Sequence, residues 1–159
     1  MNFKKLDQLK KSGQWMVRTD NDGISYKNFQ WSPVGEWTIA KDWNPSPVCG
    51  GGLHGQGPGG FGCAQPGTRF TFCETENVVS INGDKIKCKR AKILYTDKKA
   101  LIALFYVSAI FPGSLDLHGY QLPEGLKLPE SVGGSLYLEG CQLPEGLKLP
   151  ESVGKRILI

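Results

Sequence analysis

The chain has 159 residues, and 19 basic against 15 acidic side chains give it a formal net charge of +4. This length fits one ordinary domain, or a small domain followed by repeats, and the charge falls short of the strongly basic surface typical of nucleic-acid-binding proteins. The first residues lack the apolar stretch of a secretory signal, the longest apolar run is too short to span a bilayer, and five irregularly spaced cysteines indicate reduced thiols. Composition therefore predicts a cytoplasmic protein without a membrane partner, and it does not favour a nucleic-acid partner.

A short helix is expected over residues 1–13. Phe3, Leu6 and Leu9 recur with helical spacing among lysines, and Ser12 with Gly13 forms a pair that ends helices.

Residues 14–97 have the pattern of a compact, mostly antiparallel β-rich domain. Short runs rich in aromatic and β-branched residues alternate with turn residues. Within the run at 69–73, Phe70 and Phe72 fall on one face of a strand, which we expect to be buried. The predicted strands are residues 15–18, 26–31, 36–40, 69–73, 78–81 and 85–95.

Residues 98–112 are predicted to connect this domain to the C-terminal part of the chain. The run at 100–111 is apolar on all sides, so periodicity does not distinguish a buried helix from buried strands. Its length and its alanines favour a helix. We expect this helix to cover the open end of the C-terminal part.

The C-terminal part, residues 113–159, contains a tandem repeat with a period of 21 residues. Residues 114–134 and 135–155 differ at four positions only, and residues 155–159 begin a third copy. A unit of fixed length must stack on a neighbour to bury its apolar face, which predicts a short β-solenoid, similar to a leucine-rich repeat, with inward-facing leucines. The predicted fold class is therefore mainly β (α+β).

The positions at which the two copies differ are expected to be exposed, because they accept unlike side chains. They are Asp116 and Tyr137, His118 and Glu139, Tyr120 and Cys141, and Gly134 and Lys155.

The third copy of the repeat strand is expected to present a free apolar edge. Exposed strand edges invite pairing with another chain, although natural proteins often protect them instead. The sequence thus predicts a homo-oligomer, with the protected edge as the alternative. The interface residues would be Arg156, Ile157, Leu158 and Ile159.

The densest group of candidate functional residues surrounds a glycine-rich segment. Gly50, Gly51 and Gly52 precede His54, and Trp43 and Asn44 lie shortly before them. Glycines let the backbone approach a ligand, while the imidazole and the indole supply a hydrogen-bonding group and a stacking surface. The pattern predicts a ligand-binding loop. The alternative is a structural surface loop pinned by tryptophans, with His54 bound to a backbone carbonyl.

A row of lysines lies in the strand predicted at 85–95. Lys85, Lys87 and Lys89 alternate with apolar residues, so they would share one face and could bind phosphate groups. The alternative is a solvated edge strand whose lysines deter aggregation. Together with Arg18, these lysines complete the predicted site for a small anionic ligand.

No metal or cofactor is predicted. Zinc is the alternative, because Cys49, His54, Cys63 and Cys73 are suitable ligands. Their spacing, however, lacks the close cysteine pair by which structural zinc sites are recognised.

Two segments carry a resemblance to known proteins. Ala40-Lys-Asp-Trp-Asn-Pro45 and Cys49-Gly-Gly-Gly-Leu-His-Gly55 resemble an uncharacterised domain of bacteriophage and bacterial proteins, which would cover about half of the chain. The LPEGL repeats likewise resemble leucine-containing repeats of phage proteins. The resemblance implies a phage context and a ligand-binding loop, and it implies no reaction.

The leading hypothesis is a phage-associated, non-enzymatic binding protein in the host cytoplasm. It would hold a small anionic, nucleotide-like ligand or a host protein, as in sequestering a molecule of host defence. One alternative is a nucleotide-using transferase of the ADP-ribosyl type, because Gly52-Leu-His-Gly55 with Arg18 is similar to the histidine strand that contacts nicotinamide nucleotides in that fold. The other is a purely structural interaction module.

Overall fold

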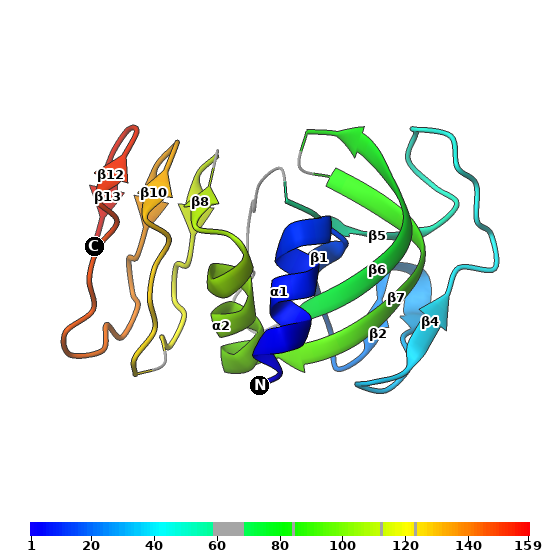
Figure 1. Ribbon diagram of the computed structural model, residues 1–159, viewed down its shortest axis with the longest axis horizontal. Helices are drawn as coiled ribbons and strands as arrows, with labels where there is room; N and C mark the ends of the chain where they lie inside the picture. Colours follow the sequence, from blue (N-terminus) through cyan, green and yellow to red (C-terminus); the bar gives the residue numbers. More distant parts are fainter. Residues whose placement is uncertain (59–68, 84, 112, 123) are drawn as a thin grey trace.

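A computed structural model describes residues 1–58, 69–83, 85–111, 113–122 and 124–159. The described chain is mainly β, with two α-helices, α1 (Phe3–Ser12) and α2 (Asp97–Val107). Figure 1 shows a curved antiparallel sheet at one end, the two helices in the middle and a stack of narrow coils at the other end. Neither helix has the length and apolar content needed to cross a bilayer.

The main sheet has five antiparallel strands in the order β4-β7-β5-β1-β6. Its strands are β1 (Trp15–Asp20), β4 (Trp37–Ile39), β5 (Leu53–Gln56), β6 (Arg69–Asn82) and β7 (Lys85–Thr96). Because β6 pairs with β7 as well as with β1, the strands β7, β5, β1 and β6 close into a ring. The short strand β4 lies outside the ring on the edge of β7.

Most of the predicted strands are present, with three differences. The predicted strands at 69–73 and 78–81 are one long strand, β6, which continues past Asn77 with that residue in the left-handed region (φ 54°). The predicted strand at 26–31 is wrong in its first half: a 3-10 turn, η1 (Tyr26–Asn28), precedes the two-residue strand β3 (Phe29–Gln30), which pairs with β2 (Ile24–Ser25). The end of the predicted glycine-rich loop is a strand, β5.

Alternate residues of β1 and β6 belong to two separate hydrophobic clusters. Phe70 and Phe72 are buried as predicted, and they pack with Trp15 and Val17 against helices α1 and α2. The next residues along these strands, among them Met16 and Cys73, belong to the second cluster. Both faces of the first half of β6 are therefore buried. The residues on the face opposite Phe70 and Phe72 are accordingly small or apolar. The second cluster comprises Met16, Trp31, Ala40, Leu53, Cys73, Ile86, Cys88, Ala91 and Ile93.

Helix α1 begins and ends where the sequence predicts. The side chain of Asn2 accepts a hydrogen bond from the backbone N–H of Lys5, which caps the first turn, and Gly13 ends the helix with φ 67°. Leu6 and Leu9 are buried, whereas Phe3 is exposed and packs on Tyr106.

Helix α2 lies between the main sheet and the coils (Figure 1). It begins earlier than predicted and ends at Val107, because Ile110 and Phe111 leave the helix to form strand β8 (Ile110–Phe111). Leu101 and Leu104 of the helix belong to the same buried cluster as Phe72 on the sheet and Leu115 in the first coil. One continuous hydrophobic core thus runs from the sheet through α2 into the coils.

The coils pair through parallel strands whose partners are 21 residues apart. Three strands, β8, β10 (Ser131–Val132) and β12 (Ser152–Val153), form one sheet. The strands β9 (Leu115–Asp116), β11 (Leu136–Tyr137) and β13 (Ile157–Leu158) form another. The leucines at equivalent positions of the first two coils are buried, as the alternating pattern predicts: Leu115, Leu117, Leu136 and Leu138.

The exposure expected at the variable positions of the two copies is correct in part. His118 and Glu139 are exposed, but Gly134 is buried and Cys141 is half-buried, with its thiol against the Leu117 carbonyl. A Cβ atom at Gly134 would meet the backbone and hydroxyl of Ser114 in the preceding coil. Lys155, at the same position one coil later, is exposed, although its backbone N–H donates to the carbonyl oxygen of Gly134.

The repeat supplies a matched pair of stability variants. Leu136 is fully buried, whereas Ile157, its partner one coil later, is 38% exposed. Leu136→Ala should lower the free energy of unfolding by about 2–3 kcal/mol, because it removes buried methyl groups and leaves a cavity. Ile157→Ala should cost about 1 kcal/mol or less. Urea unfolding of both variants measures the difference, and equal losses would contradict the stacking of these coils.

Candidate functional site

A cleft of about 950 Å³ opens where strands β1 and β5 separate. The two strands pair at a single position, Val17 with Gln56, so residues 18–20 and 53–55 diverge from that point. Arg18 and Thr19 line one side of the opening, and Leu53 and His54 line the other. The remaining lining residues are 25–31, Asp42, Cys49, Gly50, Gly51, Gly52 and Lys85.

Arg18 is the most enclosed cation of the cleft. Its side chain is 8% exposed, its guanidinium lies 4.0 Å from the ring centre of Trp31, and its Nη1 donates to Oδ2 of Asp20 at 2.8 Å. Burial lowers the pKa of Arg18, and the charge of Asp20 opposes that shift. Among the described residues, Asp20 is the only hydrogen-bond acceptor of the guanidinium, which has further N–H groups that could bind a ligand.

Asp20 fixes this arginine in place. Its carboxylate also accepts two hydrogen bonds from Arg69, at 2.8 and 3.0 Å, and one from the backbone N–H of Gly23 at 2.9 Å. Burial alone would raise the pKa of Asp20, but the hydrogen bonds from Arg69 and Gly23 and the two arginine charges lower it overall. The carboxylate is thus held ionised between two guanidinium groups.

The hairpin of β2, η1 and β3 forms an aromatic wall of the cleft. Tyr26 is 84% exposed, and Phe29 contacts Trp31 edge to face at 6.1 Å. Lys27 and Asn28 both have positive φ angles, 56° and 58°, which is an uncommon and strained conformation for residues other than glycine. In the sequence, this wall corresponds to the aromatic run at 26–31, which is predicted as a strand and not as part of the binding site.

The glycine segment forms the opposite wall and is packed against the chain behind it. A Cβ atom at Gly51 would lie 2.7 Å from Cβ of Asn44, and one at Gly52 would lie 3.2 Å from the ring of Trp43. Glycine is therefore needed here both for close packing and for positive φ angles. The backbone N–H groups of Gly51 and Gly52 have no acceptor among the described residues, so they can donate to an anion in the cleft.

His54 orders this segment rather than adding charge to it. The backbone N–H of Gly50 donates to Nε2 of His54 at 3.4 Å. Burial, together with the charges of Lys85 and Lys87, lowers the pKa of the imidazole, so the ring is neutral near pH 7. The side chain lines the cleft as a neutral hydrogen-bonding group.

Positive charge in the cleft comes from Arg18, Lys27 and Lys85, and Asp42 is the one carboxylate among the described residues that line it. The ammonium group of Lys85 lies 3.3 Å from the thiol of Cys49. Within the described part of the chain, neither Lys27 nor Lys85 forms an ion pair. Neither ammonium group is therefore neutralised by a carboxylate of the described residues, although that of Lys85 contacts the Cys49 thiol and that of Lys27 lies 5.6 Å from the ring centre of Tyr26.

Lys87 is not an exposed ligand-binding lysine, which corrects the predicted lysine row. The residue is 0% exposed, and its Nζ donates to the carbonyl oxygens of Val48 at 2.9 Å and Gly50 at 2.8 Å. Lys87 pairs with His54 of β5, and the segment before the glycines covers its side chain. Lys87 therefore holds the wall of the cleft from behind.

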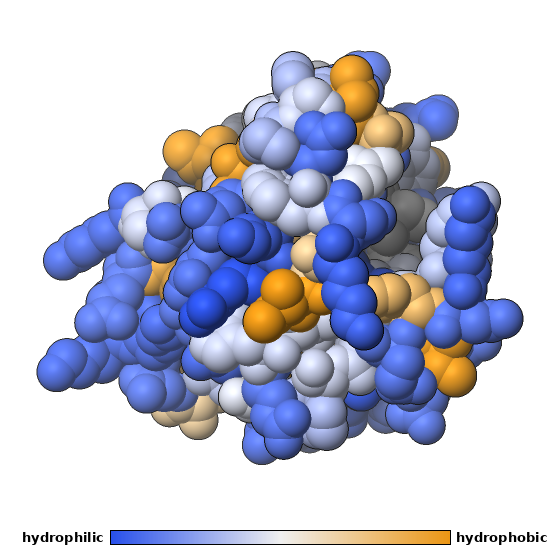
Figure 2. Space-filling model, turned by 90° about the vertical axis from the view of Figure 1, so that its right-hand side faces the viewer, coloured by the Kyte–Doolittle hydropathy of each residue, from blue (hydrophilic) through white to orange (hydrophobic). Residues whose placement is uncertain are grey.

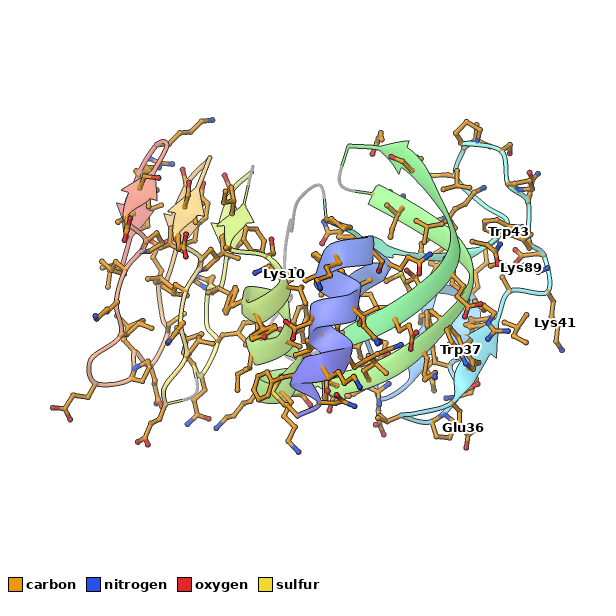
Figure 3. The ribbon with its side chains drawn as sticks, in the orientation of Figure 1. Lys10, Glu36, Trp37, Lys41, Trp43 and Lys89 are labelled. Atoms are coloured by element: carbon orange, nitrogen blue, oxygen red, sulfur yellow. The ribbon has the colours of Figure 1, made fainter. Side chains whose placement is uncertain are left out.

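Three further residues of the predicted site lie outside the lining of the cleft. Trp43 packs behind Gly52 and beside the second hydrophobic cluster, and the side chain of Asn44 accepts the backbone N–H of Ser46. Lys89 is exposed, with its carbonyl bound to the N–H of Ala40. Figure 3 shows Lys89, Trp43 and Lys41 together at the end of the molecule that carries β4.

That end of the molecule has a mixed surface. Figure 2 shows small hydrophobic spots there, separated by hydrophilic side chains. Exposed apolar residues of the segments around β4 include Val34, Ile39 and Val48. Single exposed apolar residues of this kind are ordinary on protein surfaces.

The four zinc ligands of the alternative prediction do not share one environment. Cys49 is exposed at the cleft beside His54, whereas Cys73 is buried in the second hydrophobic cluster with its thiol on Thr71. Burial raises the pKa of Cys73 to about 12, which disfavours the thiolate that zinc requires. Cys63 lies outside the described residues, and among the described residues there is no group of three or more metal-binding side chains.

Comparisons with known proteins add no relative. No family model matches the chain, and neither curated proteins nor solved structures give a significant match. We therefore infer the function of the protein from the geometry of the cleft.

Proposed function

We propose that the chain is a non-enzymatic binding protein whose cleft between β1 and β5 holds a small anionic ligand of the nucleotide type. One observation supports this proposal most directly. The same cleft is lined by cations that form no ion pair and by backbone N–H groups that have no acceptor among the described residues. Lys85 and the N–H groups of Gly51 and Gly52 lie on one wall, and Lys27 lies on the other. Backbone N–H groups beside ammonium groups are a recurrent way to bind phosphate.

The aromatic wall favours a ligand that also contains a planar ring. Tyr26 exposes most of its ring at the cleft, and Phe29 adds a second ring near it. Nucleobases stack on such side chains irrespective of their identity, and each stacked base contributes about 1–3 kcal/mol. Arg18, whose guanidinium lies over the ring of Trp31, would bind a second polar group of the ligand.

The transferase remains the alternative function, and one observation favours it. Arg18 and His54, which that hypothesis requires, line the same cleft. Turnover of NAD by the wild-type protein, lost in His54→Ala, would support a transferase and would contradict a binding protein without enzymatic activity.

We also propose a phage context, in which the nucleotide-binding cleft would serve to sequester a molecule of host defence. A host protein could instead engage the exposed ring of Tyr26. The parallel pairing of strands 21 residues apart supports a short β-solenoid for residues 113–159, which would serve in assembly.

A thermal-shift panel tests the proposed function. Nucleoside mono-, di- and triphosphates, NAD, the parent nucleosides and inorganic phosphate would each be titrated against the wild-type protein. A bound ligand at about a hundredfold excess over its dissociation constant should raise the melting temperature by about 5–10 °C.

The matched variants for this panel are Lys85→Ala and Lys89→Ala. Lys85 lines the cleft and Lys89 does not, although both are lysines of β7. Lys85→Ala should weaken ligand binding by about tenfold or more, because it removes a charge-assisted contact. Lys89→Ala should bind as the wild type does. A panel without any stabilising compound, or equal losses in both variants, would contradict the proposal.

A further inference from the structure

The last coil exposes the apolar positions that the coil before it buries. Leu143, Leu149 and Ile159 are exposed, whereas Leu122 and Leu138, which precede Leu143 and Ile159 by one period, are buried. The difference arises because each coil is covered by the next, and no described residue covers the last one. Its strands β12 and β13 pair on one edge only.

Strand β12 and its flanking residues are self-complementary in charge when two copies are aligned antiparallel. If two copies of the strand paired about Val153, Glu151 of one copy would lie opposite Lys155 of the other, and the reverse pair would form as well. Both side chains are exposed, and no ion pair of either occurs among the described residues. Opposite charges facing each other across antiparallel strands stabilise the pairing.

The preceding coil lacks this property. Its equivalent residues are Glu130 and Gly134, so the cation is absent there, and Gly134 is buried against the coil before it. Gly134 therefore belongs to a coil that has a neighbouring coil on both sides. Lys155, at the equivalent position, gives the last coil a charge pattern suited to pairing with a second copy.

We propose that the end of the coil stack is a homodimer interface in which two copies of β12 pair antiparallel about Val153, with reciprocal Glu151–Lys155 contacts. A twofold axis generates both contacts at once, as an isologous interface requires. The sequence pattern alone directs attention to Arg156–Ile159, where the exposed strand residues are apolar and the flanking charges are both cationic. The charges of Glu151 and Lys155 determine the register in which two copies of β12 would pair. This interface is independent of the cleft.

Sedimentation equilibrium of the full chain over a dilution series tests the interface. The wild type should self-associate as a dimer. Lys155→Glu and Glu151→Lys should each raise the dissociation constant by about tenfold, because both reciprocal contacts become repulsive. The double variant Glu151→Lys with Lys155→Glu should recover wild-type association.

Lys127→Glu is the matched control, since Lys127 is an exposed lysine of the preceding coil. It makes the same charge change as Lys155→Glu and should leave the dissociation constant as it is in the wild type. Circular dichroism would verify that each variant is folded. A monomeric wild type at every concentration, single reversals without effect, a double variant without recovery, or an equal loss in Lys127→Glu would each overturn the proposal.

Discussion

Replacing Asp20 by alanine should lower the free energy of unfolding by about 3–5 kcal/mol, the cost of leaving a buried charge without its partner. The Asp20 carboxylate holds Arg18, Arg69 and the backbone N–H of Gly23. Arg18 remains enclosed against Trp31 when the carboxylate is removed, so water cannot replace the lost hydrogen bonds fully. Denaturant unfolding measures the loss.

A charge-neutral variant separates the role of the charge from that of the side-chain shape. Asp20→Asn keeps the size of the side chain but removes its ionisation. Because the pKa of Asp20 is lowered by folding, its stabilising contribution is complete above the unfolded value of about 3.9 and is lost as the pH falls through the lower folded value. The wild type should therefore lose stability below about pH 4 through this group, and Asp20→Asn should lack that part of the loss.

Asp42→Ala is the control for both variants, since Asp42 is an exposed carboxylate at the same cleft. We expect it to change the free energy of unfolding by about 0.5 kcal/mol or less. Equal effects of the Asp20 and Asp42 variants would show that the two arginines do not depend on Asp20.

Replacing Lys87 by methionine should lower the free energy of unfolding by about 3–4 kcal/mol, the sum of two charge-assisted hydrogen bonds. Methionine preserves much of the buried apolar stem but leaves the carbonyl oxygens of Val48 and Gly50 without their donor. The wall of the cleft should loosen as a result. Hydrogen exchange at the backbone N–H groups of Gly51 and Gly52 would then accelerate, and ligand binding would weaken.

The contrasting variant is Lys89→Met, two residues further along β7. Lys89 is exposed and lies outside the cleft, so its replacement should be within about 0.5 kcal/mol of the wild type. If Lys87→Met were as stable as Lys89→Met, then Lys87 would not support the glycine segment.

The sequence is informative wherever a local pattern decides the structure. Phe70 and Phe72 alternate with smaller residues, and they are buried because alternation along a strand assigns them to one face. Helix α1 ends at Gly13, as the Ser12–Gly13 pair in the sequence predicts. The parallel pairing of Leu115, Leu136 and Ile157 agrees with the period of the repeat.

Prediction from the sequence is less successful where contacts between distant segments decide the outcome. Nothing local to Lys87 indicates that residues 48–50 will cover it, since a lysine between apolar residues is more often exposed. The turn at Lys27 and Asn28 lies within a predicted strand. Asparagine tolerates a positive φ angle, but at Lys27 this angle is imposed by the tight hairpin and not by residue type.

The cleft itself also depends on long-range pairing. It exists because β1 and β5 meet only at Val17 and Gln56, and no pattern in either segment specifies where two paired strands separate. The glycines nevertheless indicate the right region, since their close packing against Trp43 and Asn44 places one wall of the cleft.

The most direct test of the binding cleft is a titration of the isotopically labelled protein with a nucleoside phosphate, monitored by amide chemical shifts. The resonances of Gly51, Gly52 and His54 should move saturably, together with those of Arg18 and Tyr26 across the cleft, while Lys89 stays unchanged. Saturable shifts confined to Lys89 and its surroundings, or no saturable shift with any nucleoside phosphate, would contradict a ligand site between β1 and β5.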